Sequence, residues 1–116
     1  MILLPSHIQA SYDYLRAFTP FSRWKLPHGD EIAFKVIADK KLCGYYQHLN
    51  GEHWIGVSTA WAGAHSTLLK ITAHEMLHLK QKIHGTETKS QHNAEFKRLA
   101  GQVCRAFQWD SQDFYF

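Results

Sequence analysis

Two histidines four residues apart, with a glutamate between them, are the part of this sequence best suited to chemistry. His74 and His78 enclose Glu75 in the pattern H-E-x-x-H. Residues four apart lie on the same face of a helix, so both imidazoles could bind one metal ion. Neutral imidazole suits Zn2+, and a catalytic zinc site has three protein ligands and one open position. The pattern therefore predicts a zinc site where Glu75 is the general base for metal-assisted hydrolysis.

A chance match is the alternative interpretation of this motif. The sequence contains nine histidines in 116 residues, so the pattern can arise from composition alone. However, the motif lies within apolar residues of helical period, which a chance match would not require. We therefore favour zinc binding, with one ion per chain.

The third zinc ligand must follow His78, and four residues are candidates. His84 has the spacing of the metzincin proteases, but that arrangement needs a helix break where this chain has Gln81 among good helix formers. His92 lies one helical turn before Phe96, near the start of the next predicted helix, which can return alongside the first. We therefore favour His92 over His84. The weaker candidates are Glu87 and Glu95.

An α+β fold must position these side chains. Periodicity predicts an N-terminal helix over 6–18, strands over 32–38, 42–49 and 53–58, a central helix over 66–83 and a C-terminal helix over 96–107. Asn50-Gly51 is typical of a hairpin turn. Because every connection between the strands is too short for a crossover helix, we expect a small three-stranded antiparallel sheet.

The central helix carries the motif and should pack through one apolar stripe. Ser66 is a suitable N-cap, and Gly85 lies where the helix should end, at the C′ position. The predicted core stripe is Leu69, Thr72, Ala73, Met76, Leu79 and Ile83. The tail, residues 110–116, is aromatic and should dock onto the domain.

The whole chain, residues 1–116, fits a single domain with an ordinary globular composition. Its net charge of +3 is scattered, so nucleic-acid binding is permitted but not argued. No signal peptide and no apolar run long enough for a membrane span is recognisable, so we expect a cytoplasmic protein. Cys43 and Cys104 lack a C-x-x-C partner, and we expect free thiols.

Residues 74–78 (HEMLH) followed by residues 92–97 (HNAEFK) resemble the SprT-like zinc metallopeptidase family, which includes the Spartan proteases. That family pairs H-E-x-x-H with a later histidine in an H-[GN]-x-x-F context. The resemblance covers residues 14–110. It implies a minimal zincin-like fold, a zinc ion held by His74, His78 and His92, and hydrolysis of peptide bonds with Glu75 as general base.

The same resemblance has limits in this chain. Many relatives add a cysteine zinc ribbon or a DNA-binding region, and we expect neither here, so action on DNA-linked proteins is not carried over. The compact size suits a phage-encoded member. A peptide substrate could add a strand to a sheet edge, which we expect near residues 55–58. The group that stabilises the oxyanion stays open among His65, Tyr45 and Tyr46.

Two other functions compete with the peptidase. YbeY-type endoribonucleases use three histidines at the spacing of His74, His78 and His84, but they have glycine where this chain has Glu75. A non-catalytic zinc-binding module that binds a partner protein or DNA would need no general base, and its site would close with a fourth protein ligand. Glu75 therefore favours the peptidase.

Overall fold

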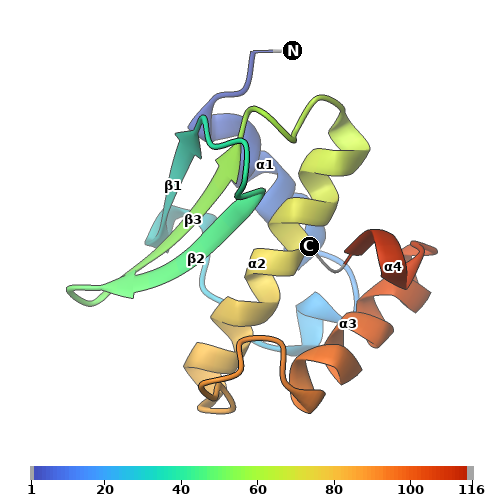
Figure 1. Ribbon diagram of the computed structural model, residues 1–116. Helices are drawn as coiled ribbons and strands as arrows, with labels where there is room; N and C mark the ends of the chain where they lie inside the picture. The colour runs from blue at the N-terminus through green and yellow to red at the C-terminus, as the bar shows by residue number, and fades with distance from the viewer. Residues whose placement is uncertain (1, 115–116) are drawn as a thin grey trace.

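The computed structural model describes residues 2–114, apart from the side chain of residue 113, and has an α+β fold (Figure 1). The elements are α1 (Pro5–Arg16), η1 (Phe21–Arg23), η2 (Gly29–Glu31), β1 (Ile32–Ile37), β2 (Gly44–Leu49), β3 (Glu52–Ser58), α2 (His65–His84), α3 (Ala94–Phe107) and α4 (Ser111–Phe114). The predicted order of a helix, three strands, a central helix and a C-terminal helix is therefore confirmed. The central helix begins one residue earlier than predicted, with Ala64 rather than Ser66 as its N-cap.

The strands form a mixed sheet in the order β1-β3-β2, so the predicted all-antiparallel sheet is wrong. β3 lies in the centre, antiparallel to β2 and parallel to β1. The hairpin between β2 and β3 is confirmed, since Asn50 and Gly51 have φ angles of 53° and 79°, as a type I′ turn requires. β1 and β2 do not pair, because the chain crosses the end of β3 between them.

Residues 38–43 carry the chain across the end of β3. Ser58, the last residue of β3, donates a hydrogen bond from Oγ to the carbonyl oxygen of Asp39 at 2.5 Å. Trp61 donates from Nε1 to the carbonyl oxygen of Lys40 at 3.1 Å. The loop is thus fastened beyond β3, and β2 returns on its far side. β1 and β3 therefore run parallel without a crossover helix between them.

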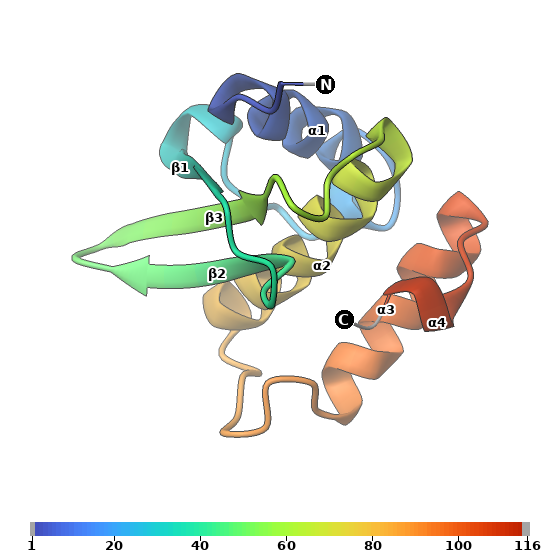
Figure 2. The ribbon, with the colours of Figure 1, turned by 45° about the horizontal axis from the view of Figure 1, so that its top comes forward.

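Helices α1 and α2 cover one face of the sheet, as both views show (Figures 1 and 2). The strand alternation places Phe34, Ile55 and Val57 on this covered face, in register across β1 and β3. Tyr12 of α1 meets the ring of Phe34 edge-on, with the ring centroids 5.6 Å apart. α2 packs on the same face against β2, β3 and α1, so the helix that carries His74 and His78 is held against both the sheet and α1.

Helix α2 runs without a break to His84 and ends at Gly85, whose φ of 69° confirms the predicted C′ glycine. Residues 71–77 are buried on every side, because the sheet, α1 and α3 all pack around this part of the helix. A single stripe was therefore too narrow a prediction. Ile83, predicted to be in the core, is 40% exposed in the last turn, whereas Leu68 is buried.

Helix α3 packs on the side of α2 that faces away from the sheet (Figures 1 and 2). Its predicted core face is confirmed by the buried side chains of Phe96, Leu99, Ala100 and Val103. α4 then turns back, and Phe114 is fully buried, as the expected docking of the tail requires. The rest of that prediction, residues 115–116, lies outside the described residues.

Cys43 and Cys104 are free thiols, as the sequence predicts. Within residues 2–114, no helix combines the length and the apolar content needed to cross a lipid bilayer.

Candidate metal centre

The three histidines predicted as ligands lie together where α2 meets the start of α3. One nitrogen from each of His74, His78 and His92 lies within 4.8 Å of the other two. Nε2 of His74 and Nε2 of His92 are 3.2 Å apart. Two nitrogens bound tetrahedrally to one zinc ion at about 2.05 Å would be about 3.3 Å apart. The cluster could therefore hold a metal ion, and the spacing of His74 and His92 matches that of two ligands of one zinc ion.

Helix α2 supplies two of the three imidazoles because its period places residues four apart on one face. The ring centroids of His74 and His78 are 5.2 Å apart. His92 comes from the segment before α3, and its ring lies 4.9 Å from the ring of His74 and 5.3 Å from that of His78. The cluster thus joins two elements, and the segment between α2 and α3 must hold His92 in place.

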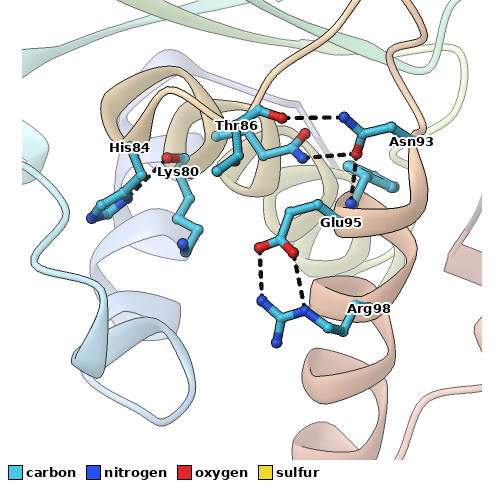
Figure 3. A network of polar contacts seen from close by, with 8 residues as sticks. Lys80, His84, Thr86, Asn93, Glu95 and Arg98 are labelled. Atoms are coloured by element: carbon cyan, nitrogen blue, oxygen red, sulfur yellow. Dashed lines mark hydrogen bonds and ion pairs between the residues drawn. The ribbon is translucent and has the colours of Figure 1, made fainter.

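Asn93 fixes the position of His92 through a network of hydrogen bonds (Figure 3). Its Oδ1 accepts the N–H of Phe96 at 2.9 Å and so caps α3. The same oxygen accepts the side-chain amide of Gln81 from α2 at 3.0 Å. Its Nδ2 donates to the carbonyl oxygen of Thr86 at 3.2 Å. α2, the connecting segment and α3 are therefore joined at the residue next to His92.

Sequence reasoning missed the role of Gln81. It treated this residue only as a helix former, yet Gln81 is buried and its amide holds Asn93. The signal was present in the spacing, since positions 74, 78 and 81 share one face of a helix. A glutamine on a buried face needs a partner, and that need predicts a contact with the next element.

The other three candidate ligands lie outside the cluster and have partners of their own, which Figure 3 shows for His84 and Glu95. α2 does not break at Gln81, so His84 remains on the exposed last turn. The partners are the carbonyl oxygen of Lys80 for His84 at 3.0 Å, Arg98 for Glu95 at 2.7 Å and Lys82 for Glu87 at 3.0 Å.

Phe96 packs against all three imidazoles and is itself fully buried. Its ring centroid lies 5.0 Å from that of His74, 4.8 Å from that of His78 and 4.6 Å from that of His92. One side chain thus limits the rotation of every ring in the cluster. This contact gives a physical role to the phenylalanine that stands four residues after His92.

The tail of the chain orients His74. Nδ1 of His74 donates to the carbonyl oxygen of Phe114 at 3.0 Å, so the proton is held on Nδ1 and the lone pair of Nε2 faces the cluster. The two residues are 40 positions apart, and the acceptor is a backbone atom. No side-chain pattern in the sequence could have predicted this contact.

The electrostatic environment keeps the imidazoles in the form that binds metal. Burial lowers the pKa of His74 to about 3 and the pKa of His78 to about 4. Burial also lowers the pKa of His92, and the charge of Lys97 adds to that effect. All three rings are therefore neutral at pH 7, which leaves a nitrogen lone pair for a cation.

Glu75 lies beside the cluster and faces β2. It is 5% exposed, and burial raises the pKa of its carboxyl group to about 8. A methyl group on Gly44 would lie 3.2 Å from Oε2 of Glu75, 2.8 Å from Ile71 and 2.7 Å from the carbonyl oxygen of Gly56. Glycine at this position therefore lets α2 and β2 approach closely enough to bring the carboxyl group against the strand.

A groove of about 610 Å³ opens over the cluster between β2 and the connecting segment. Residues 41–48 form one wall, and α2 with residues 87–92 forms the other. Glu75 and the three histidines lie in its lining, so a molecule in the groove would reach both the metal position and the carboxyl group.

The wall formed by β2 offers unpaired backbone groups. Ser58 donates its N–H to the carbonyl oxygen of Cys43 at 2.8 Å, and antiparallel pairing alternates from there. The N–H and C=O of Gly44, Tyr46 and His48 therefore face away from β3. The edge expected near residues 55–58 is wrong, because β3 is the central strand and β2 borders the groove.

No family model, no curated protein and no solved structure matches this chain. The candidate metal centre is accordingly characterised by its own geometry: three neutral imidazoles, a buried carboxyl group and a groove along a sheet edge.

Proposed function

We propose that this protein is a zinc-dependent metallopeptidase in which His74, His78 and His92 hold the metal and Glu75 is the general base. The observation that carries the proposal is the position of Glu75. Its carboxyl group lines the same groove as the three imidazoles, where a site that only stabilises the fold would need no base. The resemblance of residues 74–78 and 92–97 to the SprT-like family supports the same assignment.

The donor set favours zinc over harder cations. Three imidazole nitrogens suit Zn2+, whereas Mg2+ and Ca2+ prefer oxygen ligands. Among the side chains that the structure describes, which leave out that of residue 113, no fourth acidic, histidine or cysteine side chain joins the cluster. When bound, zinc would supply a Lewis acid that makes water a better nucleophile and polarises the scissile carbonyl group.

The residues of the chain supply proton transfer. The positive charge of a bound zinc ion would favour the ionised form of Glu75 over the protonated form that burial favours. Glu75 would then accept a proton from the attacking water at a carboxylate oxygen and pass it to the leaving amine as the peptide bond breaks. Its position against Gly44 supports this role, because a peptide bound along β2 would pass directly over the carboxyl group.

An extended peptide is the substrate that this groove fits best. A strand placed beside β2 could pair with the outward N–H and C=O groups of Gly44, Tyr46 and His48. Such pairing uses the substrate backbone, so it binds unfolded or extended segments of many sequences. We therefore propose protein or peptide substrates that are locally unfolded.

Cleavage of unfolded casein by zinc-loaded protein tests this function. We expect the wild type to cleave it, EDTA to stop the cleavage, and Glu75→Gln to lower the rate by about 100- to 10,000-fold with zinc retained. Glu87→Gln is the matched control, since Glu87 lines the groove but is bonded to Lys82. This variant should keep most of the activity.

Other outcomes would assign a different function. A folded, zinc-loaded wild type that cleaves no protein would indicate a binding module. RNA cleavage that survives Glu75→Gln would favour a metal-dependent endoribonuclease, although the position of His84 outside the cluster speaks against that function.

A further inference from the structure

Hydrolysis of a peptide bond places negative charge on the carbonyl oxygen, and enzymes stabilise that charge with a positioned hydrogen-bond donor. Three polar side chains were candidates, and the structure separates them. His65 is the first residue of α2 and is exposed, ten residues or about 15 Å along the helix from Glu75. The ring of Tyr45 lies over Gly56. Only Tyr46 remains on the face of β2 that meets α2.

Tyr45 and Tyr46 point to opposite faces of the sheet because successive strand residues alternate. Gly44 packs against Ile71 and Glu75 of α2, so Tyr46, two residues later, shares that face. Both tyrosines border the groove. The alternation along β2 places only the side chain of Tyr46 on the face of the sheet that meets α2.

The position of Tyr46 along the groove matches that of the cluster. Gly44 lies opposite Glu75 at one end, whereas His48 of β2 and Lys82 of α2 line the groove farther along. Tyr46 lies between these two points, about 6.6 Å along β2 from Gly44. His78 lies between them on α2, about 4.5 Å along the helix from Glu75. Tyr46 and the second ligand therefore stand on facing walls.

The hydroxyl group of Tyr46 is held in place by His53. Its Oη lies 2.6 Å from Nδ1 of His53 on the neighbouring strand, and the two rings stack with centroids 5.9 Å apart. His53 in turn stacks on His48, with centroids 4.6 Å apart. If Nδ1 of His53 carries the proton and donates it, the phenolic O–H is free to donate into the groove.

The environment keeps the phenol protonated. Burial raises the pKa of Tyr46 above its usual range, and the negative charge of Glu87 raises it further. The side chain is therefore a hydrogen-bond donor, not an anion, across the neutral pH range.

We propose that Tyr46 donates a hydrogen bond to the scissile carbonyl oxygen as it becomes negatively charged, and that His53 is the positioning residue that aims the phenol. The inference rests on the proposed peptidase function. Tyr46 forms no covalent bond and transfers no proton in this role. It makes its bond strongest in the transition state, so it should act on kcat more than on KM.

Tyr46→Phe and Tyr45→Phe, each compared with the wild type on one fluorogenic peptide, test the proposal. Each variant removes one hydroxyl group from β2, but only Tyr46 faces the cluster. We expect Tyr46→Phe to lower kcat by roughly 100-fold or more, with KM and zinc content within twofold of the wild type. The kcat of Tyr45→Phe should match that of the wild type. The kcat of His53→Gln should lie between those of the two tyrosine variants.

A binding measurement gives a second readout. A phosphonamidate analogue of the same peptide mimics the tetrahedral transition state, and calorimetry should show that Tyr46→Phe weakens its binding by about the factor lost in kcat/KM. Binding of the uncleaved peptide to Glu75→Gln should be unaffected when Tyr46→Phe is added.

The possible failures can be told apart. If the wild type cleaves the peptide and Tyr46→Phe retains its kcat, or only raises KM, Tyr46 is not the oxyanion donor and the peptidase function stands. If Tyr46→Phe loses zinc or unfolds, the residue is structural and the proposal is also wrong. A zinc-loaded wild type that cleaves no peptide overturns the proposed function and this inference together.

Discussion

The two walls of the groove are built in opposite ways. On the wall of α2 and α3, the imidazoles are held by Phe96, by the Asn93 network and by the carbonyl oxygen of Phe114. On the wall of β2, the backbone N–H and C=O groups of alternate residues are left for another strand to pair with. In the proposed function, the first wall is ordered in advance for a metal ion and the second is open to pair with a substrate.

Because the two walls are built differently, mutations in them should have different effects. Changes on the ligand wall should lower both stability and metal affinity, because the same contacts serve packing and ligand orientation. Changes at the β2 edge should lower substrate binding and leave the metal in place.

Phe96→Ala should have the largest effect. The ring is fully buried and contacts all three histidines, so its loss should cost about 3–5 kcal/mol of unfolding free energy. Urea denaturation with and without zinc would measure this, and the stabilisation by zinc should shrink as well. Phe107→Ala is the control, since that half-buried ring lies away from the cluster. An equal loss of zinc stabilisation in both variants would contradict the role of Phe96.

Asn93→Ala should have the second-largest effect on stability. It removes the cap of α3 and leaves the buried amide of Gln81 without its acceptor, at a combined cost of about 2–3 kcal/mol. Glu95→Ala, which breaks an exposed ion pair two residues later, should change stability far less. Thermal unfolding of the two variants compares them directly. Equal melting temperatures would mean that the network does not hold the segment before α3.

Phe114→Ala should lower stability, as the loss of any fully buried ring does, and should also weaken metal binding. Without the buried ring, the tail would no longer place its carbonyl oxygen against His74, and zinc affinity should fall by about 10- to 100-fold. Competition with a chromophoric chelator measures the affinity, with exposed Gln112→Ala as the control. Unchanged affinity in Phe114→Ala would show that His74 is oriented without the tail.

His48→Pro should have the smallest effect and act on the opposite wall. The N–H of His48 faces away from β3, so proline removes one donor for a bound peptide and no bond of the β2–β3 ladder. The loss of one hydrogen bond, about 1 kcal/mol, predicts a fivefold rise in KM with zinc retained. Gln47→Pro removes a ladder bond instead and should destabilise the fold more. If His48→Pro were less stable than Gln47→Pro, the assigned alternation of hydrogen bonds along β2 would be wrong.

The clustering of His74, His78 and His92 could be predicted from sequence because each step depended on residues close together in the chain. Helical period brings His74 and His78 together, and the helix formers around Gln81 exclude a break that would turn His84 inward. Phe96 and the cap at Asn93 then mark where the next helix begins and so where His92 lies.

The sheet order could not be predicted in this way, because it depends on contacts distant in sequence. The carbonyl oxygens of Asp39 and Lys40 accept hydrogen bonds from Ser58 and Trp61, respectively. These bonds hold the segment that crosses the end of β3. The free edge of the sheet was predicted on the wrong strand for the same reason, since the strand order decides which strand is at the edge. Ile83 is exposed because, within residues 2–114, no other element fully covers the last turn of α2 on that side. Helical period predicts which residues share a face, but not how far the neighbouring elements extend along it.

Zinc per chain, measured by elemental analysis on the wild type, His92→Ala and His84→Ala purified in parallel, tests the three-histidine centre most directly. We predict close to one zinc in the wild type and in His84→Ala, and a sharp reduction in His92→Ala. Full zinc occupancy in His92→Ala with loss of zinc in His84→Ala would contradict the three-histidine centre. So would the absence of zinc from a folded wild type purified without any chelator.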